Sequence, residues 1–265
     1  MRLSFALRSA ALALALALIP ATATVGHADP DALWRLISGQ CVVDEVQFAD
    51  PAPCAAVDLA EGVQRGHAVL KDSVGARQFL LIPTARIAGI ESAELLAPDA
   101  PNYFADAWQA RSFTEAAAGG TLPRDWISLA INSALARSQN QLHIHIDCLR
   151  ADVHDALTRY GGRLGPGWTT FPVPLAGHTY TALPVDGPDL TVNPFRLVAD
   201  ALSVENPGRD AGGDMGSQTI VVVGTRRADG SAGFLILADR ADGEGGSIAG
   251  GEQLQDHDSC AGAGQ

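Results

Sequence analysis

Two histidines and an aspartate alternate with apolar residues in one stretch of the chain, as His143, His145 and Asp147. The alternation over residues 141–149 predicts a β-strand, which places the three polar side chains on one face and the apolar ones on the other. A neutral imidazole on such a face can attack a phosphorus atom and form a covalent phosphoramidate, which divides one difficult displacement into two easier ones. That chemistry needs a neighbour that fixes the imidazole tautomer and donors that hold the phosphate oxygens.

The same residues permit two other interpretations. His-x-His-x-Asp resembles the opening of the zinc motif of metallo-β-lactamase-type hydrolases, where a further histidine binds the metal. Here Cys148 follows Asp147, so His154 and His178 would have to complete the zinc site. A solvated sheet face without chemistry is the third interpretation. We favour the nucleophilic histidine, with no metal and no cofactor, and keep the zinc-dependent hydrolase as the alternative.

The elements around this strand follow from similar patterns. Residues 127–132 also alternate, and the loop 133–138 joins them to 141–149 as two antiparallel strands. Turn residues and apolar spacing predict further hairpins and helices: hairpins at 67–71 with 77–82 and at 219–223 with 233–238, and helices at 31–37, 91–96, 102–118 and 152–159. This mixed order favours an α+β fold with an antiparallel sheet. The tail, 245–265, is expected to be ordered only where Cys260 holds it.

Residues 1–28 have the pattern of an export signal. Two arginines precede an apolar run at 10–19, and small residues follow it up to Ala28. The run is shorter than the roughly 20 residues that cross a bilayer. We therefore expect cleavage after Ala28 and a periplasmic protein, and the alternative is an uncleaved segment, 9–25, that anchors the chain in the inner membrane.

An exported protein reaches an oxidising compartment, where cysteines pair. The chain has 4 cysteines, which allow three pairings. We favour Cys41 with Cys54, which closes a short loop, and Cys148 with Cys260, which ties the tail to the middle of the chain. Four separate buried thiols are the alternative. If Cys148 and Cys260 are bonded, His257 lies beside the histidine strand.

The charge of the chain restricts its partners. With 18 basic and 30 acidic residues, the net charge is −12. Extended binding to nucleic acid depends on Lys and Arg that neutralise phosphates, so this class of partner is excluded. Any phosphate ligand must be held locally, and the composition predicts no particular oligomeric state.

The residues Asn132, Gln139, His143 and His145 have a spacing that resembles the core of the histidine-triad (HIT) nucleotide-binding proteins. In that family three histidines alternate along a strand, and the middle one is the nucleophile. In this register His143 is the first histidine, His145 is the nucleophile and Asp147 replaces the third histidine. The resemblance implies a HIT-like antiparallel sheet with flanking helices.

Asp147 is the main departure from that triad. A third histidine could donate a proton to the leaving group, whereas an ionised carboxylate can only accept one. Asp147 would orient His145 or gain proton affinity through burial, and His143 or His257 would then be the general acid. In an alternative register Gln141 is the first member and His143 the nucleophile, but that register loses the Asn and Gln match.

Further stretches resemble the bacterial CDP-diacylglycerol pyrophosphatases. The uninterrupted block 137–146 carries most of the resemblance, and shorter pieces follow in order from the mature N-terminus to the tail: 33–34 with Cys41, 69–72, 78–83, 89–92, 101–104, 107–108 with Arg111, 128–133, and 252–257 with Cys260. The resemblance implies that residues 29–265 form one such domain, a HIT-like sheet elaborated by a C-terminal β-rich extension. It also implies cleavage of CDP-diacylglycerol to CMP and phosphatidate at a membrane surface.

The loop before the histidine strand supplies candidate substrate ligands. In this interpretation His145 attacks the phosphorus on the CMP side, and water then cleaves the CMP–histidine intermediate. The donors expected to hold phosphate or ribose, and the nearest cations, are Asn132, Ser138, Gln139 and Asn140, with Arg137 and Lys71. The remaining alternative is an exported protein that binds a nucleotide or lipid head group without catalysis.

Overall fold

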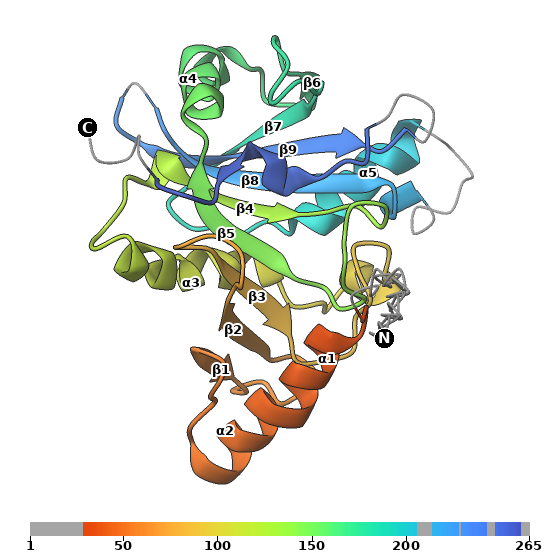
Figure 1. The fold of residues 1–265 in the computed structure, drawn as a ribbon. Helices are drawn as coiled ribbons and strands as arrows, with labels where there is room; N and C mark the ends of the chain where they lie inside the picture. Colours follow the sequence, from red (N-terminus) through yellow and green to blue (C-terminus); the bar gives the residue numbers. More distant parts are fainter. Residues whose placement is uncertain (1–28, 206–213, 228, 243–246, 261–265) are drawn as a thin grey trace, which may run out of the picture.

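The computed structural model describes residues 29–205, 214–227, 229–242 and 247–260. The predicted signal or anchor, residues 1–28, lies outside these ranges. In the described part, ten strands form one antiparallel sheet in the order β1-β2-β3-β5-β4-β8-β9-β7-β6, and β10 also pairs with β5 (Figure 1). The strands are β1 (Ala56–Asp58), β2 (His67–Lys71), β3 (Phe79–Pro83), β4 (Ile127–Ile131), β5 (Ile144–Leu149), β6 (Thr169–Thr170), β7 (Thr181–Asp186), β8 (Gln218–Arg226), β9 (Ala232–Arg240) and β10 (Gln255–Asp256).

Five α-helices lie in the described ranges, together with short helical turns. The helices are α1 (Ala32–Leu36), α2 (Val42–Phe48), α3 (Tyr103–Ala117), α4 (Ala151–Tyr160) and α5 (Pro194–Glu205). A π-helical turn (Ile37–Cys41) joins α1 to α2 as one rod. Four 3-10 turns complete the set: η2 (Ala93–Leu96), η3 (Arg124–Trp126), η4 (Gly161–Arg163) and η5 (Gly251–Leu254). None of the helices in these ranges has both the length and the apolar character of a membrane span.

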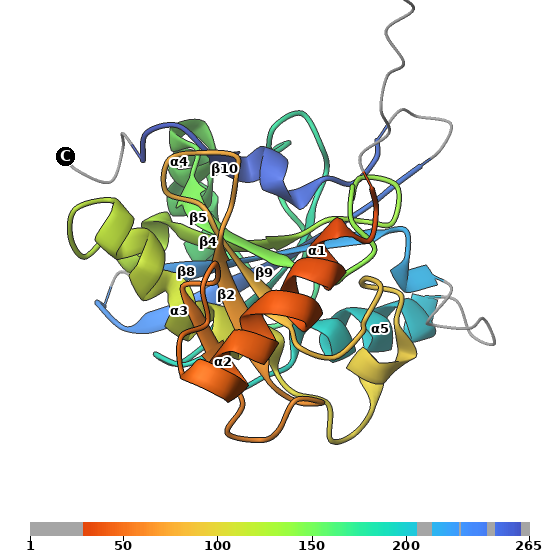
Figure 2. The same ribbon diagram turned by 60° about the horizontal axis from the view of Figure 1, so that its bottom comes forward.

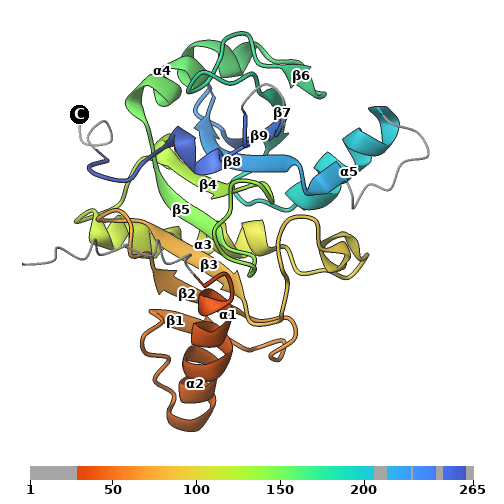
Figure 3. The ribbon, with the colours of Figure 1, turned by 45° about the vertical axis from the view of Figure 1, so that its right-hand side comes forward.

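The two faces of the sheet are covered differently. On one face α3 and α5 pack on the largest apolar core, to which β5 contributes Ile144 and Ile146. On the other face the α1–α2 rod covers β2 and β3 (Figure 2), and α4 covers β8 and β9. Between these two covers, η5 and β10 lie over β4 and β5 (Figure 3). The polar side of β5 therefore faces the C-terminal tail.

The predicted fold class is confirmed, as an α+β fold with a large antiparallel sheet. The three predicted strand pairs are present as β2 with β3, β4 with β5, and β8 with β9, although β5 begins only at Ile144. Helices α2 and α5 and strand β1 were not predicted, and the predicted helix at 91–96 is instead the 3-10 turn η2. The expectation for the tail is wrong, since residues 251–256 form η5 and β10 before Cys260 is reached. The β-rich C-terminal half carries β6 to β10.

Both predicted disulfides are present. Cys41 and Cys54 join the α1–α2 rod to the segment before β1. Cys148 and Cys260 join β5 to the tail. Next to that disulfide, β10 pairs with β5 along the edge that β3 leaves free, with Asp256 opposite Cys148. The tail is thus fixed to the histidine strand by a covalent bond and by backbone pairing.

Candidate active site

The end of the β4–β5 loop and strand β5 bring the three polar residues to one face, as the alternation predicts. His143, His145 and Asp147 are all buried there. The rings of the two histidines lie edge to face, with centroids 4.9 Å apart. On the neighbouring strands, Leu80 and Ala130 stand opposite His145. These small or apolar neighbours hold the imidazole in place but leave its nitrogens to side chains from other segments.

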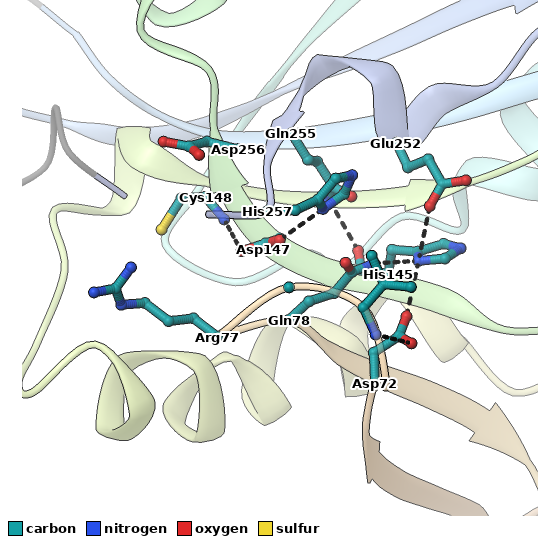
Figure 4. Close-up of polar contacts among 12 residues, drawn as sticks. Asp72, Arg77, Gln78, His145, Asp147, Cys148, Glu252, Gln255, Asp256 and His257 are labelled. Carbon is teal, nitrogen blue, oxygen red and sulfur yellow. Dashed lines mark hydrogen bonds and ion pairs between the residues drawn. The ribbon is translucent and has the colours of Figure 1, made fainter. Parts of the chain in front are cut away.

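Three polar side chains surround Nδ1 of His145 (Figure 4). The Gln78 amide is hydrogen-bonded to it, and carboxylate oxygens of Glu252 and Asp72 lie 3.4 and 3.8 Å away. Gln78 Oε1 has no hydrogen-bond partner in the described ranges, and a half-turn of the amide would let it accept a proton from Nδ1. Two carboxylates on the same side also favour the proton on Nδ1. The lone pair then lies on Nε2.

Nε2 of His145 has the features of a poised nucleophile. It is buried and has no hydrogen-bond partner in the described part of the chain. Burial lowers the pKa of His145 to about 4, although the charge of Asp72 acts in the opposite direction. Burial and the neighbouring His145 also lower the pKa of His143 to about 4, and Nδ1 of His143 donates to the Gln141 carbonyl at 2.7 Å. Both imidazoles are therefore neutral at neutral pH.

The other end of the same face carries a charged pair. His257 Nδ1 donates to Asp147 Oδ2 at 3.0 Å, and the second carboxylate oxygen accepts from the Cys148 amide at 2.8 Å. Burial raises the pKa of Asp147, and the hydrogen bond from His257 opposes this rise. The same hydrogen bond raises the pKa of His257. The contact therefore favours the arrangement in which His257 carries the proton and Asp147 is ionised.

The tail that carries His257 is held at several points besides the disulfide. The Gln255 amide donates to Ser128 Oγ at 3.0 Å and to the His145 carbonyl at 3.2 Å. The carbonyl of His257 accepts from the Ala76 amide at 3.0 Å, in the β2–β3 turn. Gly75 in that turn has φ +72°, and a Cβ there would lie 2.7 Å from the His257 carbonyl oxygen. A glycine is therefore required for the turn to meet the tail.

Two of the predicted substrate ligands line a narrow pocket with His143. Asn132 and Arg137 form part of its wall. Arg137 makes a bidentate ion pair with Glu91 at 2.5 and 2.6 Å, and Asn132 donates to Glu252 at 2.9 Å. The remaining lining residues are Gly89, Ile131, Gln141 and Leu142. The pocket lies beside His143, and the amide and guanidinium in its wall are paired with Glu252 and Glu91 in this structure.

The other predicted ligands have different partners. Gln139 accepts from the Leu33 amide at 2.9 Å and donates to the Asp29 carbonyl at 3.1 Å, so its side chain fastens the start of α1. Asn140 is exposed, and its backbone amide donates to the Pro30 carbonyl at 2.6 Å. Ser138 is also exposed. Lys71 Nζ donates to the carbonyls of Asp72 and Gly75, at 2.8 Å each. Phosphate binding by these four residues stays a prediction.

The ligand set required for the zinc alternative does not come together. His154 stacks on Trp126, with ring centroids 3.8 Å apart, and His178 lies 3.9 Å from Asp239. Within the described ranges, one group of three potential ligand atoms lies within 4.8 Å, and it consists of Asp147, Cys148 and Cys260. The two sulfurs of that group are bonded to each other. The geometry therefore does not favour a zinc site built on His143 and His145.

Sequence reasoning missed four residues of the site. Asp72 and Gln78 come from the β2–β3 hairpin, and Glu252 and Gln255 come from the tail. All four lie in or beside stretches that carry the family resemblance, 69–72, 78–83 and 252–257. The signal was a polar residue at the start of, or within, a stretch that carries the resemblance, as Gln78 stands before the apolar strand 79–83.

Comparisons with known proteins agree over nearly the whole described chain. The family model described as CDP-diacylglycerol pyrophosphatase matches residues 28–263. A CDP-diacylglycerol pyrophosphatase from Yersinia pestis is 42% identical over 228 residues, which cover 86% of this chain and 83% of that protein. The matched family region contains every residue of the site described above.

Proposed function

The chain belongs to the CDP-diacylglycerol pyrophosphatase family, and on that premise we propose that it hydrolyses CDP-diacylglycerol to CMP and phosphatidate through a covalent nucleotidyl-histidine intermediate on His145. The observation that carries the mechanism is the environment of this imidazole. Its Nδ1 faces an amide and two carboxylates, and its buried Nε2 is without a hydrogen-bond partner in the described residues. A neutral ring so oriented can act as a nucleophile.

In the first step Nε2 attacks the phosphorus on the CMP side of the pyrophosphate. The new N–P bond forms as the bond to the bridging oxygen breaks, and the electron pair leaves with phosphatidate. The ring becomes cationic while Nδ1 keeps its proton. Asp72 and Glu252, at 3.8 and 3.4 Å from Nδ1, stabilise that positive charge.

The proton for the leaving group comes from the tail. His257, protonated through its contact with Asp147, gives its proton to the departing phosphate oxygen. The second pKa of a phosphate monoester is about 6, so phosphatidate needs only modest assistance to leave. Asp147 in the third triad position is therefore compatible with catalysis, because the proton donor is His257, which is hydrogen-bonded to Asp147.

In the second step water attacks the phosphorus of CMP–His145. The N–P bond breaks, CMP leaves and His145 returns to its neutral form. Neutral His257 takes the proton of the attacking water, which restores the ion pair with Asp147. Asn132 and Arg137, in the pocket beside His143, bind the nucleotide phosphate and ribose.

The compartment follows from the cysteines. Two disulfides indicate an exported protein. We place the enzyme in the periplasm, with residues 1–28 as its export signal or as an anchor in the inner membrane.

Trapping the intermediate tests the mechanism. The purified protein is mixed with CDP-diacylglycerol, quenched in alkali within milliseconds to seconds, digested and sequenced by mass spectrometry. We expect an acid-labile CMP adduct on His145, and its absence from the His145→Ala variant. An adduct on His143 would establish the alternative register, and turnover without any adduct would exclude the covalent route.

The same preparation separates the alternative functions. Activity that persists in strong chelator is expected here, whereas a zinc hydrolase would lose it. A protein that binds CDP-diacylglycerol without forming CMP would be the non-catalytic binding protein.

A further inference from the structure

We propose that the protein docks on the lipid bilayer through one rim of its site, where Leu135 and Ile248 expose apolar side chains. This inference rests on the proposed lipid substrate. Leu135 is 62% exposed and Ile248 46% exposed. They lie in different segments, the β4–β5 loop and the strap before η5, and hydrogen bonds join those segments.

Hydrogen bonds bring the segments that carry Leu135 and Ile248 side by side. The Ser133 amide donates to the Ala249 carbonyl at 3.1 Å, and Ser133 Oγ is hydrogen-bonded to the Ile248 carbonyl. Ser133 Oγ also accepts from the Leu135 amide at 3.2 Å. A single serine thus joins the turn that carries Leu135 to the backbone of Ile248.

This rim is also a wall of the substrate pocket. Asn132 and Arg137 line the pocket with His143, and they directly flank the turn 133–136 that carries Leu135. Gly89 makes the approach of Arg137 possible, because a Cβ there would lie 1.8 Å from its guanidinium. A surface that touches Leu135 therefore comes within a few residues of the pocket mouth.

The chain before α1 enters at the same rim. Gln139 and Asn140, just beyond the turn, are hydrogen-bonded to the carbonyls of Asp29 and Pro30 at 3.1 and 2.6 Å. The start of α1 accordingly lies beside the β4–β5 loop in Figures 1 and 3. The segment that precedes Asp29 contains the apolar run 10–19. If this segment stays attached, it joins the protein to the membrane beside the pocket.

The chemistry of the substrate requires such a contact. Each acyl methylene buried in a bilayer contributes about 0.8 kcal/mol, so a diacyl lipid keeps its chains in the membrane and presents only its head group. A protein with a net charge of −12 gains no general attraction to anionic lipid. Apolar contact by Leu135 and Ile248 brings the pocket to the pyrophosphate without such an attraction.

The far end of the molecule offers a matched control. Phe48, at the end of α2, is 69% exposed, a little more than Leu135. At a rise of about 1.5 Å per residue, the α1–α2 rod places it roughly 25 Å from Pro30. The same substitution at Phe48 therefore changes exposed apolar surface but leaves the proposed docking rim intact.

The test compares two substrates. L135D/I248D, F48D and the unsubstituted full chain are assayed on long-chain CDP-diacylglycerol in phosphatidylethanolamine–phosphatidylglycerol vesicles, and on dihexanoyl CDP-diacylglycerol as dissolved monomers. We expect L135D/I248D to lose about tenfold or more in kcat/KM on vesicles and less than twofold on the monomer, and F48D to match the unsubstituted protein on both. The milder L135S/I248S should show a smaller loss in the same direction.

Equal losses on both substrates, or full vesicle activity in L135D/I248D, would overturn the docking proposal. The docking proposal would also be overturned if F48D lost as much kcat/KM on vesicles as L135D/I248D. If the unsubstituted protein forms CMP from neither substrate, the proposed function itself fails, which is a separate result.

Discussion

The imidazoles of His145 and His257 lie at the same face of β5 but have opposite electrostatic surroundings. His145 is buried, its nearest carboxylate oxygen is 3.4 Å from Nδ1, and its pKa falls to about 4. His257 is 28% exposed, donates to Asp147 at 3.0 Å, and has a raised pKa. Desolvation destabilises the charged form of His145, whereas the hydrogen bond to the Asp147 carboxylate stabilises the charged form of His257. Solvent access and direct contact, more than the number of nearby carboxylates, therefore decide which imidazole pKa falls and which rises.

The largest effect on activity should come from removal of the His145 imidazole. His145→Ala should lower kcat by roughly 10⁴-fold or more, because no other group in the site carries a free lone pair in the same position. His143→Ala should cost about 100-fold or less. Steady-state kinetics measures both losses, and circular dichroism shows whether each variant is folded. A His145→Ala enzyme more active than His143→Ala would reverse the assignment.

Substitution of His257 is expected to lower kcat less than substitution of His145. His257→Gln should lower kcat about 10- to 100-fold, since general acid catalysis assists a leaving group whose second pKa is already near 6. In the unsubstituted enzyme kcat/KM should stay high until the pH approaches about 4, where His145 becomes protonated. It should fall at high pH, as His257 loses its proton above its ordinary value of 6.5. His257→Gln should abolish that alkaline fall and leave the acid one; an unchanged alkaline limb would exclude His257 as the acid.

Removal of the disulfide that holds the tail should reproduce the His257 effect and not the His145 effect. Cys148→Ser with Cys260→Ser leaves His145 on its strand but frees the end of the tail, so we expect a kcat loss no larger than that of His257→Gln. A cross-link that spans 112 residues contributes about 4 to 5 kcal/mol to the free energy of unfolding in the chain-entropy description. Denaturant unfolding and activity well below the midpoint would be measured together.

The other disulfide supplies the matched control. Cys41→Ser with Cys54→Ser removes a cross-link over 13 residues, worth about 3 kcal/mol, far from His257 in the chain. Stability should fall while kcat is retained. Equal kcat losses in both double variants would mean that the Cys148–Cys260 bond acts only through overall stability.

Among the variants of groups that contact the two imidazoles, the smallest loss of kcat should come from Asp72, one of the carboxylates near His145. Asp72→Asn removes a charge that raises the pKa of His145, so the acid limb of kcat/KM should move to lower pH. The cationic ring formed in the first step also loses stabilisation, and kcat should fall about 3- to 10-fold. An acid limb that moves to higher pH, or does not move, would show that Asp72 does not act on His145.

Local sequence patterns predict much of the fold and part of the candidate site. The alternation over 141–149 assigns His143, His145 and Asp147 to one face, and the structure has them there, buried. Two hairpins, α3 and the Cys41–Cys54 pairing were also predicted, because turns, apolar periodicity and short loop length are local properties. The Cys148–Cys260 pairing, which spans 112 residues, was predicted as the partner of that choice among the four cysteines. The substrate ligands were harder, since Gln139 and Lys71 have the expected side-chain chemistry but hydrogen-bond to the backbone of this chain.

The sequence by itself determined which side chains share the polar face of the histidine strand, since a period of two is built into any strand. Only the tertiary structure decided what stands around them. The pairing of β3 with β5 sets Leu80 opposite His145 and brings Gln78 to Nδ1 of His145. The pairing of β10 with β5 sets Asp256 opposite Cys148 and brings His257 to Asp147. Such contacts join segments 67 to 110 residues apart. The predicted Cys148–Cys260 disulfide indicated that His257 would lie beside the strand, but no pattern indicated the same for Gln78, Asp72 or Glu252. These contacts arise from strand pairing and burial, which act on the whole chain at once.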